Sequence, residues 1–441
     1  MNFRTLETQN WSRSLDRSST SRQLHFVLTV TIVVEEKQAA KMSKLFTPLK
    51  LGSVELDHRI AMAPLTRYRA DDDRVPLPIV KGASPHHPHT CLWTNKQIEY
   101  YVQRASTPGT LLITEATLIS LRAAGRLNVP GIWSDDQIAG WREVVDAVHA
   151  KGCKIFCQLW HLGRAAHPEV LRANGHRLLS SSAVAIDPTR EVPEEMTEAE
   201  IRETIAEYAL AAKNAVTGAG FDGVEIHGAN GYLPDQFLQD VCNRRTDGWG
   251  GSIANRARFH LSVTKAVVEA VGADRVGMRL SPHSEYLGMR MADPLPTFEY
   301  LVTELKKFGL AYLHLVEGRI SGQSDTDVRE GETNTPLIRI WGKSSPVLLA
   351  GGFTPESARE VVDKTYKDYD VVVVFGRHFI ANPDLVFRLR NGVALNKYDR
   401  PTFYLPKVPK GYIDYPFFTV NQEESGEEEE EEAGQEISAS A

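Results

Sequence analysis

The chain has 441 residues, of which 42% are hydrophobic and 24% charged, and these proportions exclude an intrinsically disordered protein. Its formal net charge is −7, but residues 421–441 hold nine glutamates and no lysine or arginine, so the body of the chain lacks the excess charge that would favour nucleic-acid binding. Four cysteines without a Cys-x-x-Cys pair exclude a disulfide scaffold, and the longest apolar run, 24–34, falls well short of the roughly 20 residues that cross a bilayer.

The two ends of the chain differ from its middle. Residues 1–41 are rich in serine and arginine, and regular apolar runs start only after Met42. We therefore expect residues 1–41 to be an extension that is disordered or not native. The like charges of residues 421–441 predict a solvated, disordered tail. Residues 42–420 are expected to form one domain of a cytoplasmic protein, because the few cysteines indicate a reducing compartment.

Between these ends, short apolar runs alternate with longer stretches at helical spacing. The runs are rich in β-branched residues, and their continuous apolar character is typical of parallel strands buried on both faces. This alternation predicts strand–helix units. Eight runs are predicted as strands: 59–65, 110–119, 154–160, 223–228, 276–282, 312–318, 346–352 and 371–377.

Capping signals mark the starts of three intervening helices. Ser134 with Gln137, and Thr197 with Glu200, form capping-box patterns. Thr354 precedes a proline at the first helical position, where the missing N–H does no harm. Eight such units in about 380 residues predict an α/β fold, the (β/α)8 TIM barrel with long βα loops. A doubly wound sheet is the competing architecture, but no Gly-x-Gly-x-x-Gly follows the first strand.

Residues 82–98 interrupt the pattern between the first strand and its helix. The segment contains His86, His87, His89 and Cys91 among prolines. The prolines oppose a regular ligand geometry, so no metal site is expected. Three interpretations stay open: a lid over the active-site mouth, a metal-binding loop, or translated intron sequence.

Polar residues gather where the fourth predicted strand ends, which is the active-site end of a barrel. His227 closes this run, and Asn230 and Tyr232 follow it. His227 and Asn230 can donate hydrogen bonds to an oxygen that gains negative charge. Tyr232 stays protonated near neutral pH and can serve as a general acid. A structural role for the histidine is the alternative interpretation.

The last two predicted strands end in glycines beside a basic residue. The seventh run ends in Gly351 and Gly352, and the eighth ends in Gly376 and Arg377. Glycines let backbone N–H groups approach a phosphate, and Arg377 can neutralise it, so these loops predict a phosphate site. Arg279 closes a buried strand, where it faces either an anionic or electron-rich ligand or a structural salt bridge.

Further stretches occur in a fixed order along most of the chain. They are LFTP at 45–48, APLTR at 63–67, PGIWS at 130–134, QLW at 158–160, NRARF at 255–259, LHLVE at 313–317 and NKYDR at 396–400. Together with the residues that follow the fourth strand, they make the sequence resemble the fungal type of the Old Yellow Enzyme family, which contains FMN-dependent NADPH dehydrogenases and ene-reductases.

This resemblance implies a barrel with an N-terminal β-hairpin lid and non-covalent FMN across its C-terminal face. His227 and Asn230 would bind the substrate carbonyl, and Tyr232 would be the proton donor. Matches to the family's motifs place further side chains at the cofactor: Pro64, Thr66, Ala116, Gln158, Arg279, Gly351, Gly352, Gly376 and Arg377. The walls of the substrate pocket would be Trp160, Tyr286, Phe403 and Tyr404.

The resemblance also implies an activity. Hydride from NADPH would pass through flavin N5 to the β-carbon of an α,β-unsaturated ketone or aldehyde, while Tyr232 protonates the α-carbon. A flavin-dependent isomerase or desaturase of secondary metabolism, and a non-catalytic paralogue disabled by residues 82–98, are the alternatives. The expected partner is a small enone, without nucleic acid or membrane, for a monomer or homodimer.

Overall fold

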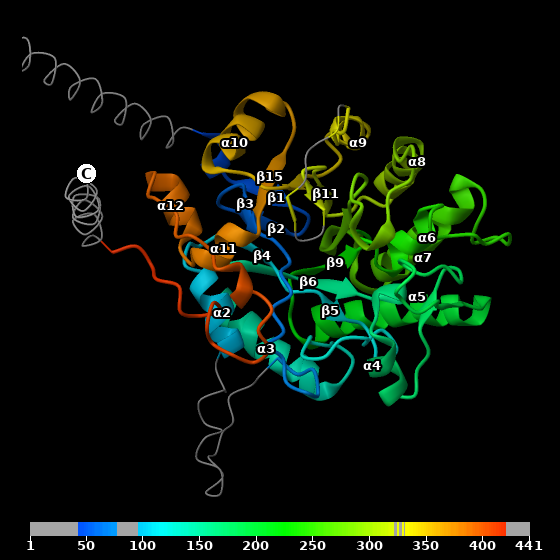
Figure 1. Cartoon of the computed structure of the whole chain (residues 1–441). Helices are drawn as coiled ribbons and strands as arrows, with labels where there is room; N and C mark the ends of the chain where they lie inside the picture. Colours follow the sequence, from blue (N-terminus) through cyan, green and yellow to red (C-terminus); the bar gives the residue numbers. More distant parts are fainter. Residues whose placement is uncertain (1–42, 77–95, 322–323, 326–328, 330, 420–441) are drawn as a thin grey trace, which may run out of the picture. The chain divides into compact units, whose positions relative to one another are not determined.

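The computed structural model describes residues 43–76, 96–321, 324–325, 329 and 331–419. Within them, eight parallel strands form a closed ring, because β15 pairs with β3 and each of the others pairs with the next along the chain (Figure 1). The predicted (β/α)8 barrel is confirmed. The ring consists of β3 (Ile60–Met62), β4 (Leu111–Ile113), β6 (Lys154–Trp160), β9 (Gly223–His227), β10 (Val276–Leu280), β11 (Tyr312–Val316), β14 (Val347–Ala350) and β15 (Val371–Phe375).

Each predicted strand contains one strand of the ring, but the run 110–119 contains two strands instead of one. β4 is followed by β5 (Thr117–Leu118), which pairs with β6 and forms a single bridge from Leu118 to Gly131. Between them the backbone N–H of Glu115 donates to the Tyr101 hydroxyl at 2.9 Å instead of to a neighbouring strand. The interruption therefore satisfies its backbone hydrogen bond with a buried side chain.

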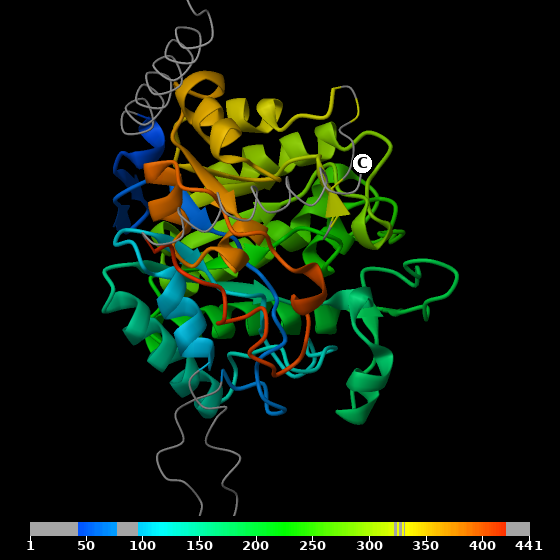
Figure 2. The same cartoon turned by 60° about the vertical axis from the view of Figure 1, so that its left-hand side comes forward.

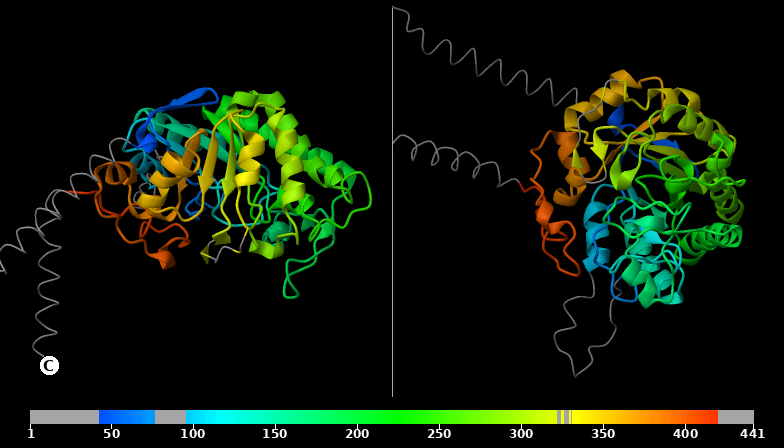
Figure 3. Two further views of the ribbon diagram at one scale, coloured as in Figure 1. Left: turned by 90° about the horizontal axis from the view of Figure 1, so that it is seen from above. Right: turned by 45° about the vertical axis from the view of Figure 1, so that its right-hand side comes forward.

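Helices are arranged around the ring of strands (Figure 3, right). The predicted caps are present, with Ser134, Thr197 and Thr354 each accepting from the third backbone N–H of its helix. The α-helices are α2 (Lys96–Arg104), α3 (Asp135–His149), α4 (Pro168–Ala173), α5 (Glu198–Lys213), α6 (Leu233–Leu238), α7 (Ile253–Val271), α8 (Leu295–Lys306), α9 (Thr335–Trp341), α10 (Pro355–Glu360), α11 (Arg377–Ala381) and α12 (Leu385–Asn391).

Shorter elements join this framework. In the described part of the chain, three two-stranded pairings lie outside the ring: β1 (Leu49–Leu51) with β2 (Val54–Leu56), β7 (Leu179–Ser180) with β8 (Glu194–Glu195), and β12 (Ile320–Ser321) with β13 (Ser324–Asp325). Two π-helical turns, η4 (Asn214–Gly218) and η7 (Val361–Thr365), extend α5 and α10. The 3-10 turns are η1 (Lys44–Phe46), η3 (Gly163–Ala165), η5 (Ala273–Arg275), η6 (Tyr286–Gly288) and η8 (Arg400–Thr402).

The β1–β2 hairpin closes the N-terminal end of the barrel (Figure 3, left). The backbone N–H of Ser53, at its turn, donates to the carbonyl of Asp274, directly ahead of β10. Leu51 and Leu56 are fully buried in one apolar cluster with barrel-interior residues such as Phe156. The expected hairpin therefore exists, and it covers the end of the barrel opposite to the carboxyl ends of the strands.

A segment with little regular structure, residues 398–412, packs beside α2 and the residues after β3 (Figure 2). Buried arginines satisfy its backbone carbonyls. Arg67 donates to Phe403 and Gly411, at 3.1 and 2.5 Å. Arg69 donates to Thr402, Phe403, Val408 and Lys410, and Arg104 to Tyr412. These contacts fix the backbone that carries Phe403 and Tyr404.

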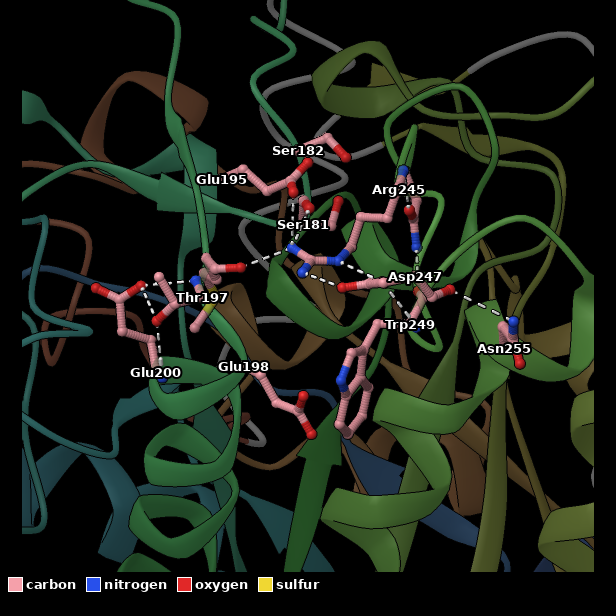
Figure 4. A network of polar contacts seen from close by, with 12 residues as sticks. Ser181, Ser182, Glu195, Thr197, Glu198, Glu200, Arg245, Asp247, Trp249 and Asn255 are labelled. Atoms are coloured by element: carbon pink, nitrogen blue, oxygen red, sulfur yellow. Dashed lines mark hydrogen bonds and ion pairs between the residues drawn. The ribbon is translucent and has the colours of Figure 1, made fainter.

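Arg245 anchors the long loop between β6 and α5 (Figure 4). Its guanidinium donates to the carbonyls of Ser181 and Met196, at 3.1 and 2.7 Å, and to the carboxylate of Asp247, at 2.6 and 3.0 Å. Only 4% of its side chain is exposed, and Glu195 lies 3.4 Å away. One buried cation thus ties this loop to the segment that follows α6.

Several expectations fall on other parts of the chain. Those for residues 1–41, for 82–95 and for 421–441 lie outside the described residues, whereas residues 96–98 begin α2. Within the described ranges, no helix is both long and apolar enough to cross a membrane.

Candidate active site

A cavity of about 620 Å³ opens among the residues that follow the barrel strands. This is the end at which barrels carry their active sites. All sixteen predicted site residues line it: Pro64, Thr66, Ala116, Gln158, Trp160, His227, Asn230, Tyr232, Arg279, Tyr286, Gly351, Gly352, Gly376, Arg377, Phe403 and Tyr404. The structure therefore brings together residues that are up to about 340 positions apart, while the role of each one stays a prediction.

His227, Asn230 and Tyr232 meet on one wall. His227 is the last residue of β9, and Tyr232 caps α6. The Tyr232 ring packs edge-on against His227 at 4.8 Å and against Trp160 at 4.9 Å between centroids. Asn230 has a left-handed backbone, with φ of 57°, and its N–H donates to the Ser281 hydroxyl at 2.7 Å. This turn presents three side chains of different chemistry to one cavity.

Burial sets the protonation of two of these groups. It lowers the pKa of His227 well below its usual value, and the charges of Arg279 and His314 lower it further. The imidazole is therefore neutral at pH 7 and offers one N–H donor. Burial raises the pKa of Tyr232, so its phenol keeps its proton throughout the physiological range. The wall thus holds neutral hydrogen-bond donors and a protonated acid.

A buried carboxylate that the sequence analysis did not single out lies one layer below. Glu225 is two residues before His227, so both side chains point into the barrel. Its carboxylate accepts from Gln158 Nε2 at 2.8 Å and pairs with His314 Nδ1 at 2.7 Å. Burial alone would raise the pKa of Glu225, but His314, Arg279 and Gln158 outweigh it and hold that pKa below its usual value. The alternation Glu-x-His along a strand was the available signal.

The predicted phosphate end lies at the loops after β14 and β15. Gly352 has φ of +65°, and a Cβ added to Gly351 would stand 2.5 Å from the Cβ of Glu317, so side chains are disfavoured at both positions. Arg377 Nη1 donates to the Tyr398 hydroxyl at 3.3 Å. Arg319 also lies here, with its guanidinium 3.4–3.5 Å from the position that a Cβ would take at Gly352. Arg319 and Arg377 therefore lie beside a stretch of backbone, at Gly351 and Gly352, that carries no side chains.

The residues present fit FMN. Buried nitrogens at the cavity lack a hydrogen-bond partner among the described residues: Trp160 Nε1, His227 Nδ1, Arg279 Nε and His378 Nδ1. Unpartnered buried polar atoms are costly, so such a set indicates a polar ligand. The described lining also contains five arginines and no aspartate or glutamate, which suits a ligand that carries a phosphate.

Other lining residues were not predicted, among them Tyr68, Arg126, Phe353, His378 and Pro401. Tyr68, Arg126 and Phe353 lie in loops, where spacing carries no strand or helix signal, whereas His378 lies in α11 and Pro401 in η8. Tyr398 and Arg400 belong to a stretch that supported the resemblance, but no role followed from it. Among the described residues, no group of three or more His, Cys, Asp or Glu is placed to hold a metal ion.

Comparison with known proteins decides the family. Residues 44–396 match the NADH:flavin oxidoreductase / NADH oxidase family. The solved structure of Old Yellow Enzyme from Pichia sp. AKU4542 matches with a TM-score of 0.75 and 36% identity, over 86% of this chain and 94% of that one. The chain is a member of the Old Yellow Enzyme family. It is therefore an oxidoreductase with FMN as cofactor and a reduced nicotinamide nucleotide as hydride donor.

Two curated members of the Old Yellow Enzyme family are more similar in sequence. The chanoclavine-I aldehyde reductase fgaOx3 of Penicillium roqueforti is 58% identical, over 85% of this chain and 97% of its own length. The probable inactive reductase easA of Epichloe festucae var. lolii is 54% identical, over 85% of this chain and 95% of its own. Relatives at this level of identity thus include proteins described as active and as inactive.

Proposed function

We propose that this chain reduces the C=C bond of α,β-unsaturated ketones or aldehydes, with NADPH as the hydride donor. The observation that carries the proposal is the meeting of His227, Asn230 and Tyr232 on one wall of the cavity that also contains Gly351 and Arg377. Bound FMN supplies the hydride carrier that this chemistry needs.

His227 and Asn230 are proposed to hold the substrate's carbonyl oxygen. As the β-carbon gains hydride, negative charge moves onto that oxygen, where two preorganised donors stabilise it most. A neutral imidazole suits this role, because it donates a hydrogen bond without releasing its proton to the oxygen. Tyr232, protonated and in contact with His227, delivers a proton to the α-carbon.

The remaining predicted residues are proposed to hold the cofactor and to shape the pocket. Pro64 and Thr66 would hold the polar edge of the flavin ring, Gln158 would bond its pyrimidine portion, and Ala116 would lie beside the ring. Arg279, near the Glu225 carboxylate, would offset negative charge on the flavin ring. Gly351, Gly352, Gly376 and Arg377 would hold the phosphate. Trp160, Tyr286, Phe403 and Tyr404 form the aromatic walls.

Tyr232→Phe tests the proposal through separate half-reactions. We expect the variant to be bleached by NADPH at the wild-type rate but to be reoxidised by cyclohexenone about 100-fold or more slowly, because it lacks the acid. Anaerobic stopped-flow absorbance measures both steps. Equal reoxidation rates for variant and wild type would remove Tyr232 from this role.

The name of the 54% identical relative supports one alternative, a flavin protein without catalysis. A purified protein that is yellow but is not reoxidised by cyclohexenone would establish it. An isomerase or desaturase would instead convert its substrate without net consumption of NADPH. Product analysis under excess NADPH separates these cases, and the presence of Tyr232 favours net reduction.

The nucleotide donor, the cellular location and the oligomeric state are also part of the proposal. NADPH rather than NADH as the hydride donor stays a prediction from the family resemblance. A cytoplasmic location, and a monomer or homodimer that binds a small enone, stay predictions. Size-exclusion chromatography with light scattering measures the oligomeric state.

A further inference from the structure

Arg126 is a cation of the cavity to which the proposed reaction gives no role. It lies in the loop between β5 and α3, and it lines the cavity together with Tyr68, Tyr286 and Tyr404. Arg279 and Arg377 have proposed roles at the flavin, and Arg319 borders the phosphate end at Gly352. Arg126 instead lies on the aromatic side, where its charge reaches the Tyr232 hydroxyl.

No carboxylate among the described residues pairs with Arg126. Its one partner there is a neutral group, the Tyr68 hydroxyl, to which Nη1 donates at 3.0 Å. Arg122, four residues earlier, provides the contrast, since it pairs with both Glu203 and Glu207. A half-buried guanidinium with a single neutral partner retains most of its donors for a ligand.

The backbone on both sides of Arg126 is held in place. A Cβ added to Gly125 would stand 2.1 Å from the Cβ of Ala166, and the Gly125 carbonyl accepts from the His167 N–H at 2.8 Å. On the other side, Asn128 Nδ2 donates to the Ala70 carbonyl at 3.1 Å. The backbone that carries the Arg126 side chain is therefore held before any ligand arrives, which lowers part of the entropic cost of binding.

We infer that Arg126 forms an anion subsite, which selects enones or enals that carry a carboxylate or another negative group away from the reacting carbonyl. The inference rests on the proposed function. The carbonyl oxygen binds His227 and Asn230, the ring or chain of the substrate lies along the aromatic walls, and the anionic group accepts from Arg126. Substrates of this family member are then anionic, and cationic analogues are disfavoured by the same charge.

A matched pair of substrates tests the subsite. One is a cyclohexenone with a carboxylate on a short alkyl side chain, and the other is its methyl ester. Holoenzyme bleached with dithionite under anaerobic conditions is mixed with each compound, so that NADPH, itself an anion, takes no part. We expect the wild type to prefer the acid at neutral pH. Arg126→Met should slow the acid's reaction by about 10- to 100-fold, the effect of one charge-assisted hydrogen bond.

Three controls isolate the charge. The ester should react within about twofold of the wild-type rate in Arg126→Met, because it offers no anion. Arg126→Lys keeps the charge but loses the planar fork, so it should restore part of the preference. Tyr68→Phe removes the partner of Arg126 while keeping its charge, and it should leave the preference for the acid in place.

Calorimetry gives a second measurement that needs no turnover. The saturated acid should bind oxidised wild-type holoenzyme at least about 10-fold more tightly than Arg126→Met. Equal rates for acid and ester in the wild type, or an equal loss for both in Arg126→Met, would overturn the subsite. If neither compound reoxidises the protein, the proposed function fails, and the calorimetric comparison still decides whether Arg126 binds the anion.

Discussion

The two ends of the barrel are built from the same strands and differ in what they leave unsatisfied. At the N-terminal end, the β1–β2 hairpin and side chains such as Leu51, Leu56 and Phe156 form a fully buried apolar cluster. At the C-terminal end, Trp160, His227 and Arg279 each retain a buried nitrogen without a partner among the described residues. The side chains at the N-terminal end are packed against one another, whereas polar atoms at the C-terminal end remain available to bind a ligand.

Because of this difference, some residues of a strand contribute mainly to folding stability and others mainly to the reaction. Packed apolar groups lower the free energy of the folded state, whereas preorganised polar groups raise it until a ligand binds. β9 contains both within five residues, since Val224 packs in the apolar core and His227 faces the cavity. Substitutions at the two ends should consequently have opposite signatures in stability and in rate.

The largest effect is expected at the N-terminal end. Phe156→Ala removes a fully buried ring that packs against Tyr312 at 5.6 Å between centroids. It should lower the free energy of unfolding by about 3–5 kcal/mol, measured by urea denaturation of the holoenzyme. Phe387→Ala, at a ring that is 44% exposed on α12, is the matched control and should change it by less than about 1 kcal/mol. Similar losses in the two variants would contradict the assignment of this end to stability.

His227→Ala should produce the opposite signature at the C-terminal end. Loss of a donor to the developing charge should slow reoxidation by cyclohexenone about 100- to 1,000-fold. The midpoint of urea denaturation should decrease less than in Phe156→Ala, because His227 Nδ1 has no partner to lose among the described residues. Stopped-flow and denaturation data on one preparation check both parts, and a large loss of stability with an unchanged rate would reverse the comparison.

Buried charge should also make stability depend on pH. Burial raises the pKa of Glu115 from 4.5 to about 7, although Arg67 and Arg69 oppose the shift. A carboxyl group with a raised folded-state pKa contributes most below its unfolded pKa, and the contribution is lost as pH rises through the folded pKa. Between pH 4.5 and 7, wild type should therefore lose about 2–3 kcal/mol relative to Glu115→Gln.

Urea denaturation at a series of pH values measures this difference. Glu99→Gln, at an exposed position on α2, serves as the control and should follow wild type at every pH. Parallel curves for wild type and Glu115→Gln would show that the neighbouring arginines keep Glu115 ionised throughout.

The smallest effect is expected for a residue that lies near the cavity but takes no part in the reaction. Ser134 caps α3 close to the cavity end, and its hydroxyl accepts from the Gln137 N–H at 3.3 Å. Ser134→Ala should cost about 1 kcal/mol of stability and leave reoxidation by cyclohexenone within about twofold of the wild-type rate. Ser134→Asp keeps an acceptor and should recover most of the loss. Slow reoxidation of Ser134→Ala by cyclohexenone would mean that residues outside the cavity also control the rate, contrary to the comparison between the two ends.

Much of the barrel could be predicted because its strands are apolar runs with local signals. The run predicted at 154–160 coincides with β6, and the caps at Ser134, Thr197 and Thr354 are present. The site residues at strand ends follow from the barrel itself, since its topology gathers them at one end. The family resemblance added the cofactor.

What could not be predicted depends on contacts between distant parts of the chain. The two-residue pairing of β7 with β8 has no periodicity to detect. The partners of Glu225 come from β6 and β11, and nothing near Glu225 in sequence indicates them. No sequence pattern around Arg126 indicates a role for it. The role inferred for its side chain depends on the absence of a carboxylate partner among the described residues.

The attachment of residues 398–412 also bears on synthesis. Arg67 and Arg69 emerge from the ribosome more than 300 residues before the carbonyls that they bind. At the usual rate of synthesis, about 5–20 residues per second, the guanidiniums of Arg67 and Arg69 lack these partners for on the order of tens of seconds. The strands of the ring can pair during that interval, but the wall formed by Phe403 and Tyr404 is added last. An incomplete nascent chain can therefore hold most of a barrel while still lacking a finished pocket.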